Sequence, residues 1–305
     1  MNIAFTINQL GVEGLGATLS SMLHHCSDSA QLDLYFLCNK LDKQHKENIQ
    51  TLLQSKNFEG SYQFINFDAK KEFGHLHSLH GDWTAYGKLL IPELIGTEKI
   101  LSLDSDLLIL LDILELNNFQ QEDYAVVAYN TGEAQHTRDS FFYYNRLQLP
   151  LRTPICNTGI MLFNSSIWKA QKVTQRYQKL GEKYAPHLLC ADQTLLNATL
   201  GGEFGHLPYK YNFRWFPDLA NDNQQSVIFH FVGSPKPWDI LGKQIHPAYD
   251  SWLHYQPNLW TTKYSAVTYQ KICRTWKIRK SIARCLISQF KSGINASTNY
   301  YPSNL

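Results

Sequence analysis

The sequence has 305 residues, of which 44% are hydrophobic and 13% aromatic, enough to bury a sizeable core as one large domain or as a domain with an appendage. This composition excludes a disordered or fibrous chain. The formal net charge is +2, but eight of the 28 Lys and Arg lie in residues 251–305 together with none of the 26 acidic residues, which predicts an acidic body with a basic C-terminal region.

Short β-branched or aromatic segments predict strands. They occupy residues 2–7, 32–38, 61–66, 99–103, 124–129, 159–163 and 226–231. Helices are predicted at 16–25 and 42–55 between the early strands, and later at 166–183 and 191–199. This alternation favours βαβ units and therefore an α/β fold with a mainly parallel sheet. Residues 292–305 are predicted to be disordered.

Cysteine usage and the first residues bear on the compartment. The six cysteines form no CxxC pair, which indicates reduced thiols in an intracellular protein and argues against a zinc site or a disulfide framework. No basic segment precedes residues 2–7, and no apolar run approaches the roughly 18 residues of a membrane span. We therefore expect neither a signal peptide nor a transmembrane helix.

The glycine-rich segment 11–16 follows the first predicted strand. Its backbone amides are placed to face a phosphate at the start of the next helix. The spacing is not GxGxxG, however, and a plain tight turn is an equally good interpretation.

Two carboxylates, Asp104 and Asp106, follow the strand predicted at 99–103 inside a very apolar segment. At extended spacing both side chains point to one face. Two buried carboxylates this close repel each other unless a cation lies between them. They either end the strand and cap the next segment, or they hold a divalent cation through hard oxygen ligands, as Mg²⁺ or Mn²⁺ prefers.

Further polar residues stand at the ends of predicted elements. Residues 229–239 bring together His230, Gly233 and Lys236: an imidazole ligand, a backbone donor and a cation, as a metal-bound diphosphate requires. A lone strand histidine is otherwise a core residue. Asn157 and Gly159 lie at the entry of a strand, and Asp192 and Gln193 lie at the start of a helix, where an acidic residue also favours the helix dipole.

Taken in order, five segments resemble the retaining glycosyltransferases of family eight, which include bacterial lipooligosaccharide galactosyl- and glucosyltransferases and are related to glycogenin. The segments are WTAYGKLLIPELI, LSLDSDLLIL, CNTGIMLFN, ADQTLLN and FHFVGSPKPW. The resemblance covers roughly residues 1–245 and rests on DxD combined with HxxGxxKPW. It implies an A-type glycosyltransferase fold, a Rossmann-like mixed sheet flanked by helices. We expect a catalytic domain at 1–250 and a basic helical region with a flexible tail at 251–305.

The resemblance also implies residue roles. Asp104, Asp106 and His230 are the expected ligands of Mn²⁺ or Mg²⁺, and Gly233 and Lys236 the diphosphate contacts. The remaining expected donor or acceptor contacts are Asn8, His80, Lys88, Ser105, Asn130, Asn157, Gly159, Asp192 and Gln193. The sequence departs from the family where Lys88 replaces a frequent Arg, and where the first strand ends in TINQLG without the usual acidic, Tyr-containing loop.

The expected function is metal-dependent transfer of a hexose, galactose or glucose, from a UDP-sugar to a hydroxyl of a surface glycan or lipid-linked oligosaccharide, with no nucleic-acid partner. Retention through same-face attack is favoured, with Gln193 stabilising an oxocarbenium-like centre, although Asp192 is a possible nucleophile. One alternative is a catalytically inactive sugar-binding protein, which would be expected to lack a metal ligand. The other is a Mg²⁺-dependent phosphohydrolase, which would carry its DxD after the first strand.

The basic region contains apolar positions at helical spacing over residues 269–290, interrupted near 279–280. A helix packed on the domain is one interpretation. We favour an amphipathic helix on an anionic membrane surface, with Trp276 at the interface and Lys271, Arg274, Lys277 and Arg284 supplying positive charge. This predicts a cytoplasmic protein that is peripheral at the inner face of the membrane.

Overall fold

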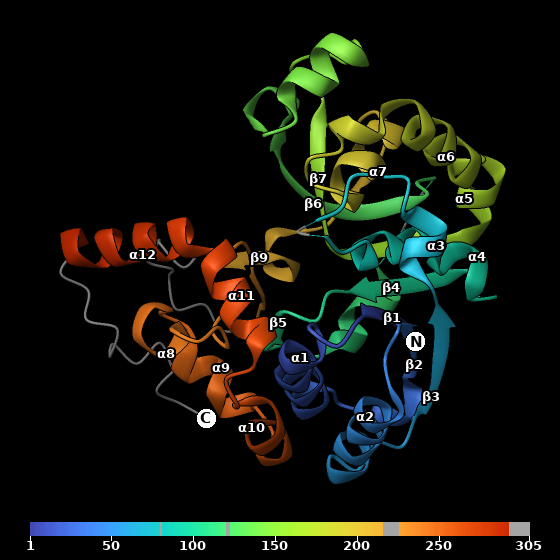
Figure 1. Cartoon of the computed structure of the whole chain (residues 1–305). Helices are drawn as coiled ribbons and strands as arrows, with labels where there is room; N and C mark the ends of the chain where they lie inside the picture. Colours follow the sequence, from blue (N-terminus) through green and yellow to red (C-terminus); the bar gives the residue numbers. More distant parts are fainter. Residues whose placement is uncertain (80, 120–122, 216–225, 293–305) are drawn as a thin grey trace.

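The computed structural model describes residues 1–79, 81–119, 123–215 and 226–292, and its centre is a seven-stranded sheet of order β3-β2-β1-β4-β7-β6-β8 (Figure 1). The strands are β1 (Asn2–Ile7), β2 (Asp33–Asn39), β3 (Ser61–Phe67), β4 (Lys99–Leu103), β6 (Val126–Glu133), β7 (Pro154–Asn164) and β8 (Gly205–His206). Every neighbouring pair is parallel except those that β7 makes with β4 and β6. The predicted α/β fold with a mainly parallel mixed sheet is confirmed.

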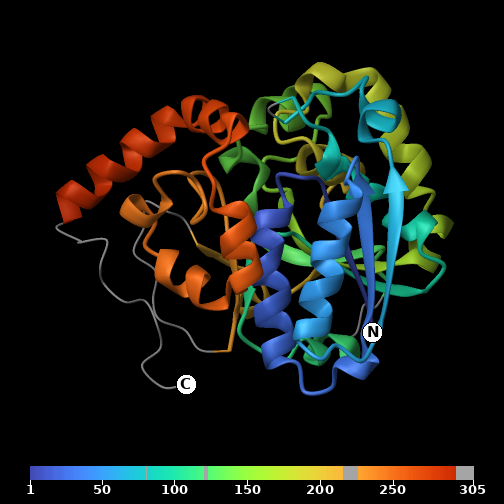
Figure 2. The same ribbon diagram turned by 60° about the horizontal axis from the view of Figure 1, so that its bottom comes forward.

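Helices cover both faces of this sheet. Side chains alternate along each strand, so Ile3 and Phe5 pack into one core with the helices α1 (Val12–His25) and α2 (Lys43–Ser55), whereas Ala4 joins the core of the opposite face. Figure 2 shows α1 and α2 side by side along the strands. The opposite core includes residues of α3 (Ala69–Phe73), α4 (Ile91–Leu94), α5 (Ser165–Ala170), α6 (Val173–Tyr184) and α7 (Asp192–Leu200).

A second, three-stranded sheet adjoins the first. Its order is β5-β10-β9, from β5 (Leu107–Ile109), β10 (Ile228–Phe231) and β9 (Phe213–Trp215). Residues 104–106 lead directly from the end of β4 in the large sheet to the start of β5 in the small one. Because β10 runs antiparallel to β5 with His230 opposite Leu107, this histidine lies beside the crossing segment.

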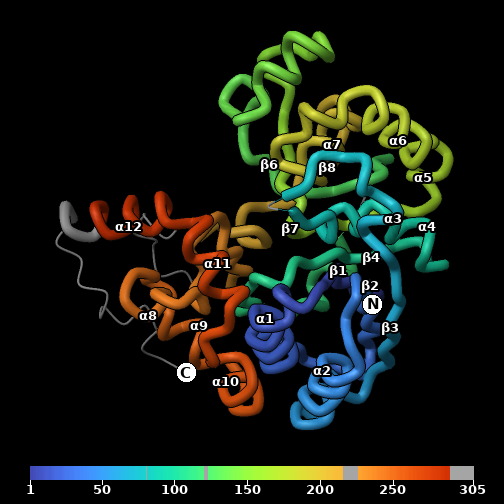
Figure 3. The backbone as a smooth tube through the Cα atoms, in the orientation of Figure 1, coloured from blue at the N-terminus to red at the C-terminus, as the bar shows by residue number. Residues whose placement is uncertain are grey.

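The described C-terminal helices are α8 (Gly242–Ile245), α9 (Tyr249–Tyr255), α10 (Asn258–Tyr264), α11 (Tyr269–Lys277) and α12 (Arg279–Ser292) (Figure 3). Of these, α9 and α10 pack against α1, whereas α12 packs against α8 and points away from α1. Trp260 of α10 is fully buried in the core beside α1, and its Nε1 donates to the Val12 carbonyl over 2.7 Å. The predicted break near residue 279 is confirmed at Ile278, whereas the division into domains at residue 250 stays a prediction.

Several expected boundaries moved. α1 begins at Val12, four residues before its predicted start, so most of the glycine-rich segment 11–16 is helical and the turn lies at 9–11. Gly14 lets this helix approach the site, because a Cβ there would lie 2.5 Å from the Ser105 carbonyl oxygen. The helix predicted at 166–183 is two helices, α5 and α6, separated by a left-handed Lys172 with φ 52°.

Three further expectations concern the cysteines, membrane-spanning helices and the C-terminal segment. All six cysteines are free. Within the described residues, no helix combines the length and the apolar character needed to cross a membrane. The segment predicted to be disordered lies, from residue 293 onward, outside the described residues.

Candidate functional site

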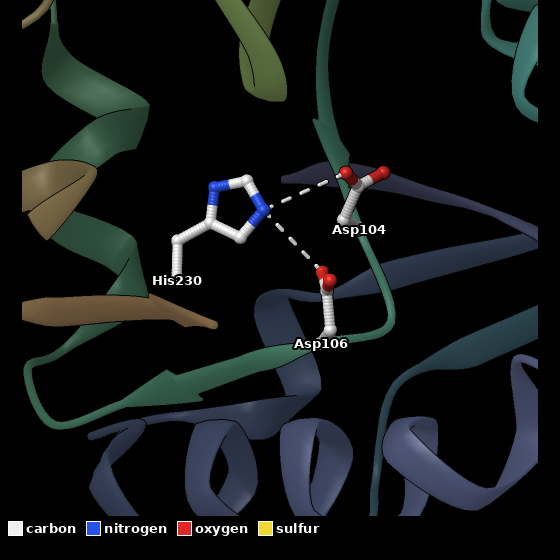
Figure 4. Close-up of side chains that lie close together, drawn as sticks. All are labelled: Asp104, Asp106 and His230. Carbon is white, nitrogen blue, oxygen red and sulfur yellow. Dashed lines mark ion pairs between the residues drawn. The ribbon is translucent and has the colours of Figure 1, made fainter. Parts of the chain in front are cut away.

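The crossing between the two sheets brings the predicted metal ligands together. Asp104 follows β4, Asp106 precedes β5, and His230 reaches them from β10 (Figure 4). One ligand atom from each of these side chains lies within 4.8 Å of the others. Two backbone hydrogen bonds hold this arrangement in place. The Asp104 amide donates to the Gly159 carbonyl over 2.8 Å, and the Phe231 amide donates to the Asp106 carbonyl over 3.0 Å.

The imidazole of His230 presents a lone pair to the carboxylates. Its Nδ1 lies 3.1 Å from Asn212 Oδ1, and Asn212 is oriented by donating its Nδ2 to Asn157 Oδ1 over 2.9 Å. The Nδ1 atom therefore carries the proton, and Nε2 faces Asp106 Oδ1 at 3.5 Å and Asp104 Oδ2 at 3.9 Å. Burial lowers the pKa of His230 to about 4, so the ring is neutral at pH 7.

These donors fit a divalent cation. Asp106 Oδ1 is buried and has no hydrogen-bond partner among the residues that the structure describes, and an imidazole lone pair aimed at carboxylate oxygens is repulsive unless a cation lies between them. Two carboxylates and one imidazole form a donor set that Mn²⁺ accepts and that leaves coordination positions open for a substrate. The same residues suit Mg²⁺ less well, because that ion prefers oxygen donors alone.

Two lysines already compensate the aspartates. Lys236 Nζ lies 2.6 Å from Asp106 Oδ2, and Lys88 Nζ lies 2.7 Å from Asp104 Oδ1. Burial raises the pKa of Asp104 to about 7 even though Lys88 opposes the shift. Burial also acts to raise the pKa of Asp106, but the surrounding charges, with that of Lys236 the largest, and the hydrogen bond from Lys236 together outweigh it and hold that pKa below its ordinary value.

The residues expected around the transferred sugar lie beside this cluster. Asp192, at the start of α7, accepts from Thr158 Oγ1 over 2.8 Å and from Lys88 Nζ over 3.3 Å, both at Oδ2. Gln193 Oε1 accepts from Asn157 Nδ2 over 3.2 Å. One hydrogen-bonded path therefore runs from Gln193 through Asn157 and on to the buried Asn212 and the metal-site histidine.

Gly159 is required by the close approach of β7 to the histidine. A Cβ on this residue would lie 2.2 Å from His230 Cε1, far inside van der Waals contact. The glycine therefore makes room for the ring of a candidate metal ligand.

The other expected contacts are placed as follows. Gly233 follows β10 with a φ of +81°, and Ser105 stands between the two aspartates. Asn8 is engaged within the protein, accepting from the Gly11 amide over 2.9 Å and donating to Asp82. Asn130 lies in β6, and its Oδ1 accepts from the Gly132 amide over 2.9 Å. His80 lies outside the described residues, and the ligand contacts of all these residues stay predictions.

A cavity of about 450 Å³ opens beside Asp106 and Lys236. Its walls come from the turn at 9–11, from the loop after β10, and from residues 263–274 of the C-terminal helices. No pattern in the sequence indicated that this last wall or Asn212 lies at the site. Asn212 immediately precedes a three-residue strand, which is too short to show a periodic pattern.

Comparisons with known proteins agree with this geometry. The family model described as glycosyl transferase family 8 matches residues 2–242. Among relatives from Streptococcus pneumoniae serotype 4, the glycosyltransferase GlyA is 24% identical over 59% of this chain and 24% of its own length. GlyE of the same organism is 22% identical over 72% of this chain and 53% of its own length. This chain thus spans about half, or less, of the curated relatives it matches.

Solved structures share the fold. The galactosyltransferase LgtC in complex with donor and acceptor sugar analogs superposes with a TM-score of 0.71 at 16% identity, covering 88% of this chain and 98% of that one. GlyE of Streptococcus pneumoniae TIGR4 superposes with a TM-score of 0.62 at 17% identity, covering 100% of this chain and 65% of that one. At such identities the likeness shows an A-type glycosyltransferase fold.

Proposed function

Because this chain belongs to glycosyl transferase family 8, we propose that it transfers a hexose, galactose or glucose, from a UDP-sugar to an acceptor hydroxyl with retention of configuration. The observation that carries this proposal is the cluster of Asp104, Asp106 and His230 with Lys236 against it. The cluster stands where a parallel strand, β4, ends, which is where ligands gather in sheets of this kind. The neighbour LgtC, crystallised with donor and acceptor sugar analogs, lends support.

The cluster is suited to hold a diphosphate leaving group. A bound Mn²⁺ or Mg²⁺ supplies electrostatic stabilisation of the negative charge that develops on the departing diphosphate. Lys236 Nζ is placed to contribute to the same task, because its hydrogen bonds within the described part of the chain go to the carboxylate of Asp106 and the Phe231 carbonyl. The backbone amide of Gly233, three residues earlier, is the expected second contact.

The environment of Asp192 favours same-face attack. Its Oδ2 is held by Thr158 and Lys88, and its side chain is buried. A carboxylate fixed by a lysine and a hydroxyl is a weakened nucleophile, but it is well suited to position neighbouring groups. Gln193, oriented by Asn157, then supplies the amide oxygen that stabilises an oxocarbenium-like centre.

A sugar-nucleotide screen tests the proposal. Purified protein with Mn²⁺ is given UDP-glucose, UDP-galactose and UDP-N-acetylglucosamine, and UDP release is measured. We expect hydrolysis of one of them, lost in excess chelator, and a turnover number lowered by Lys236→Ala more than acceptor binding is weakened. Tight Mn²⁺-dependent binding of UDP-sugars without any release would instead favour the inactive sugar-binding protein.

We propose a lipid-linked or cell-surface glycan as the acceptor, reached from an anionic membrane surface through the C-terminal helices. The support is the outward face of α11 and α12, where Tyr269, Ile272 and Trp276 are 80%, 53% and 69% exposed and Leu286 and Ile287 continue the face. Basic residues flank this face, as expected of a helix lying on anionic lipid. Lys271 and Arg274 point inward, however, where each pairs with a carboxylate.

Vesicle sedimentation tests the membrane proposal. Truncation after Gln256 removes the buried Trp260, so the double substitution Ile272→Ser with Trp276→Ser is cleaner, with Tyr144→Ser, at a side chain 52% exposed elsewhere, as control. We expect the full chain and the control to bind anionic vesicles at low salt and to be released at high salt. Equal binding by the double variant, or binding that ignores salt, would contradict the proposal.

A further inference from the structure

The wall of the cavity formed by residues 263–274 lies beyond residues 2–242 matched by the family model. This wall lines the same cavity as Asp106 and Lys236. We propose that residues 263–274 bind the nucleoside diphosphate part of the donor, so that α11 completes the donor site of this particular chain. The inference rests on the proposed function and extends it to residues that neither the motifs nor the family match include.

Two ion pairs hold α11 across the cavity. Lys271 Nζ lies 2.7 Å from Oε1 of Glu13, a residue of α1 that is only 7% exposed. Arg274 binds Asp239 with two bonds, Nε to Oδ1 at 2.6 Å and Nη2 to Oδ2 at 3.1 Å. Paired, partly buried charges of this geometry fix a helix more firmly than exposed ones do. These ion pairs therefore fix the position of α11 as one wall of the cavity.

The same contacts link α11 to the metal cluster. Oδ2 of Asp239 accepts from the backbone amide of Lys236 over 2.7 Å, while the Lys236 ammonium lies on Asp106. A displacement of Arg274 is thereby transmitted through one carboxylate to the loop that carries the expected diphosphate contacts. Through these contacts, α11 is connected to the residues expected to bind the diphosphate.

The lining indicates what the cavity accepts. It carries Asp106 and Lys236, the groups suited to a cation and a diphosphate. Lys271 and Arg274 are each paired with a lining carboxylate, but the lining as a whole has four Lys or Arg against three acidic residues, and this excess of positive charge suits an anion better than a neutral glycan. The lining also carries the rings of His45 and Tyr264, whose centroids are 5.7 Å apart, and the amide of Gln270.

A ligand that is anionic at one end and a flat, hydrogen-bonding heterocycle at the other satisfies all of these groups. A nucleoside diphosphate has this chemistry, and a volume of about 450 Å³ lies within the range of about 300–1,000 Å³ found for small-molecule sites. The turn at 9–11, which follows β1, lines the same cavity. The base would therefore lie between the turn and the C-terminal wall.

Calorimetric titration of UDP into the full chain with saturating Mn²⁺ tests the inference. The variants are Arg274→Ala, which removes the pairing with Asp239, and Gln270→Ala, which changes an exposed lining residue. Lys280→Ala, on the exposed surface of α12, is the matched control for loss of positive charge. Titration of Mn²⁺ alone and the melting temperature are recorded for each protein.

We expect Arg274→Ala to weaken UDP binding at least tenfold and Gln270→Ala to weaken it several-fold, while Lys280→Ala binds UDP as the native chain does. Mn²⁺ binding alone should change in none of them, because its ligands are untouched. If Arg274→Ala also lowers the melting temperature, its weaker UDP binding can be explained by lost stability, and the UDP affinity of Gln270→Ala then decides the test. Native affinity for UDP in both variants would overturn the inference and leave the proposed function standing, whereas a native chain that binds Mn²⁺ but neither UDP, GDP nor ADP would overturn both.

Discussion

Replacing Lys88 by Met removes the cation at the centre of the buried cluster while keeping a side chain of similar length. Lys88 is 5% exposed, and its Nζ lies 2.7 Å from Asp104, 3.3 Å from Asp192 and 3.2 Å from the Thr158 carbonyl. Breaking a buried ion pair by deleting one partner costs about 3–5 kcal/mol, because the remaining charge is left uncompensated. We expect the free energy of unfolding to fall by about that amount.

The assay is urea unfolding followed by tryptophan fluorescence in excess chelator, with Lys43→Met as control. Lys43 is 91% exposed and lies 3.6 Å from Glu47, a surface pair worth about 0.3–0.5 kcal/mol. Repeating the titration with Mn²⁺ at about 100 times its dissociation constant for each protein should add about 2.7 kcal/mol in every case, because the ion binds the folded chain and not the unfolded one. A loss below about 1 kcal/mol for Lys88→Met, or equal losses for both variants, would refute the reasoning.

Three further predictions follow from the site and its surroundings. Asp106→Asn, which keeps the shape and removes the ligand charge, should lower sugar transfer by orders of magnitude with an unchanged circular dichroism spectrum, and full native activity in excess chelator would contradict it. Gly159→Ala places a Cβ 2.2 Å from the His230 ring and should weaken Mn²⁺ binding at least tenfold in a titration, whereas Gly96→Ala, with no atom within 4 Å of the added Cβ, should not. Burial raises the pKa of Glu13 from 4.5 to about 7, so the folded chain binds a proton more tightly than the unfolded chain does. The native chain should therefore lose up to about 3 kcal/mol of stability as the pH rises from 4.5 to about 7. The melting temperatures of Glu13→Gln and the native chain should diverge over this pH range, and a difference that stays constant with pH would contradict the prediction.

Regular elements and the aspartates of the candidate metal site were predictable because their signals are local. The apolar strands at 2–7 and 99–103 and the helix opened by the N-cap Asp42 were each visible in consecutive residues. Asp104 and Asp106 stood out because carboxylates are rare within such an apolar segment. To predict that His230 lies beside them, the order of the motifs along the chain was needed as well.

The remaining parts depend on contacts that no local pattern reveals. β5 and β9 are three residues long and form only because β10 lies between them. The pairing of Asp239 with Arg274 joins residues that are 35 positions apart, and it follows from the packing of α11 against the site loop. The periodicity of residues 269–290 predicted a helix but not which of its cations would turn inward. In the sequence, Lys271 and Arg274 cannot be told apart from neighbouring lysines and arginines that stay on the surface.

The crossing at residues 104–106 has a mechanical consequence. Asp104 terminates a strand of the large sheet, whereas Asp106 and His230 belong to the segments that build the small one. A single cation held by all three would fasten two hydrogen-bonded units that are otherwise joined here by a short stretch of chain. Small sliding motions of one sheet against the other would then be damped when the ion binds. Amide hydrogens of β5 and β10 would exchange with solvent more slowly, even though the ion touches only one residue of those strands.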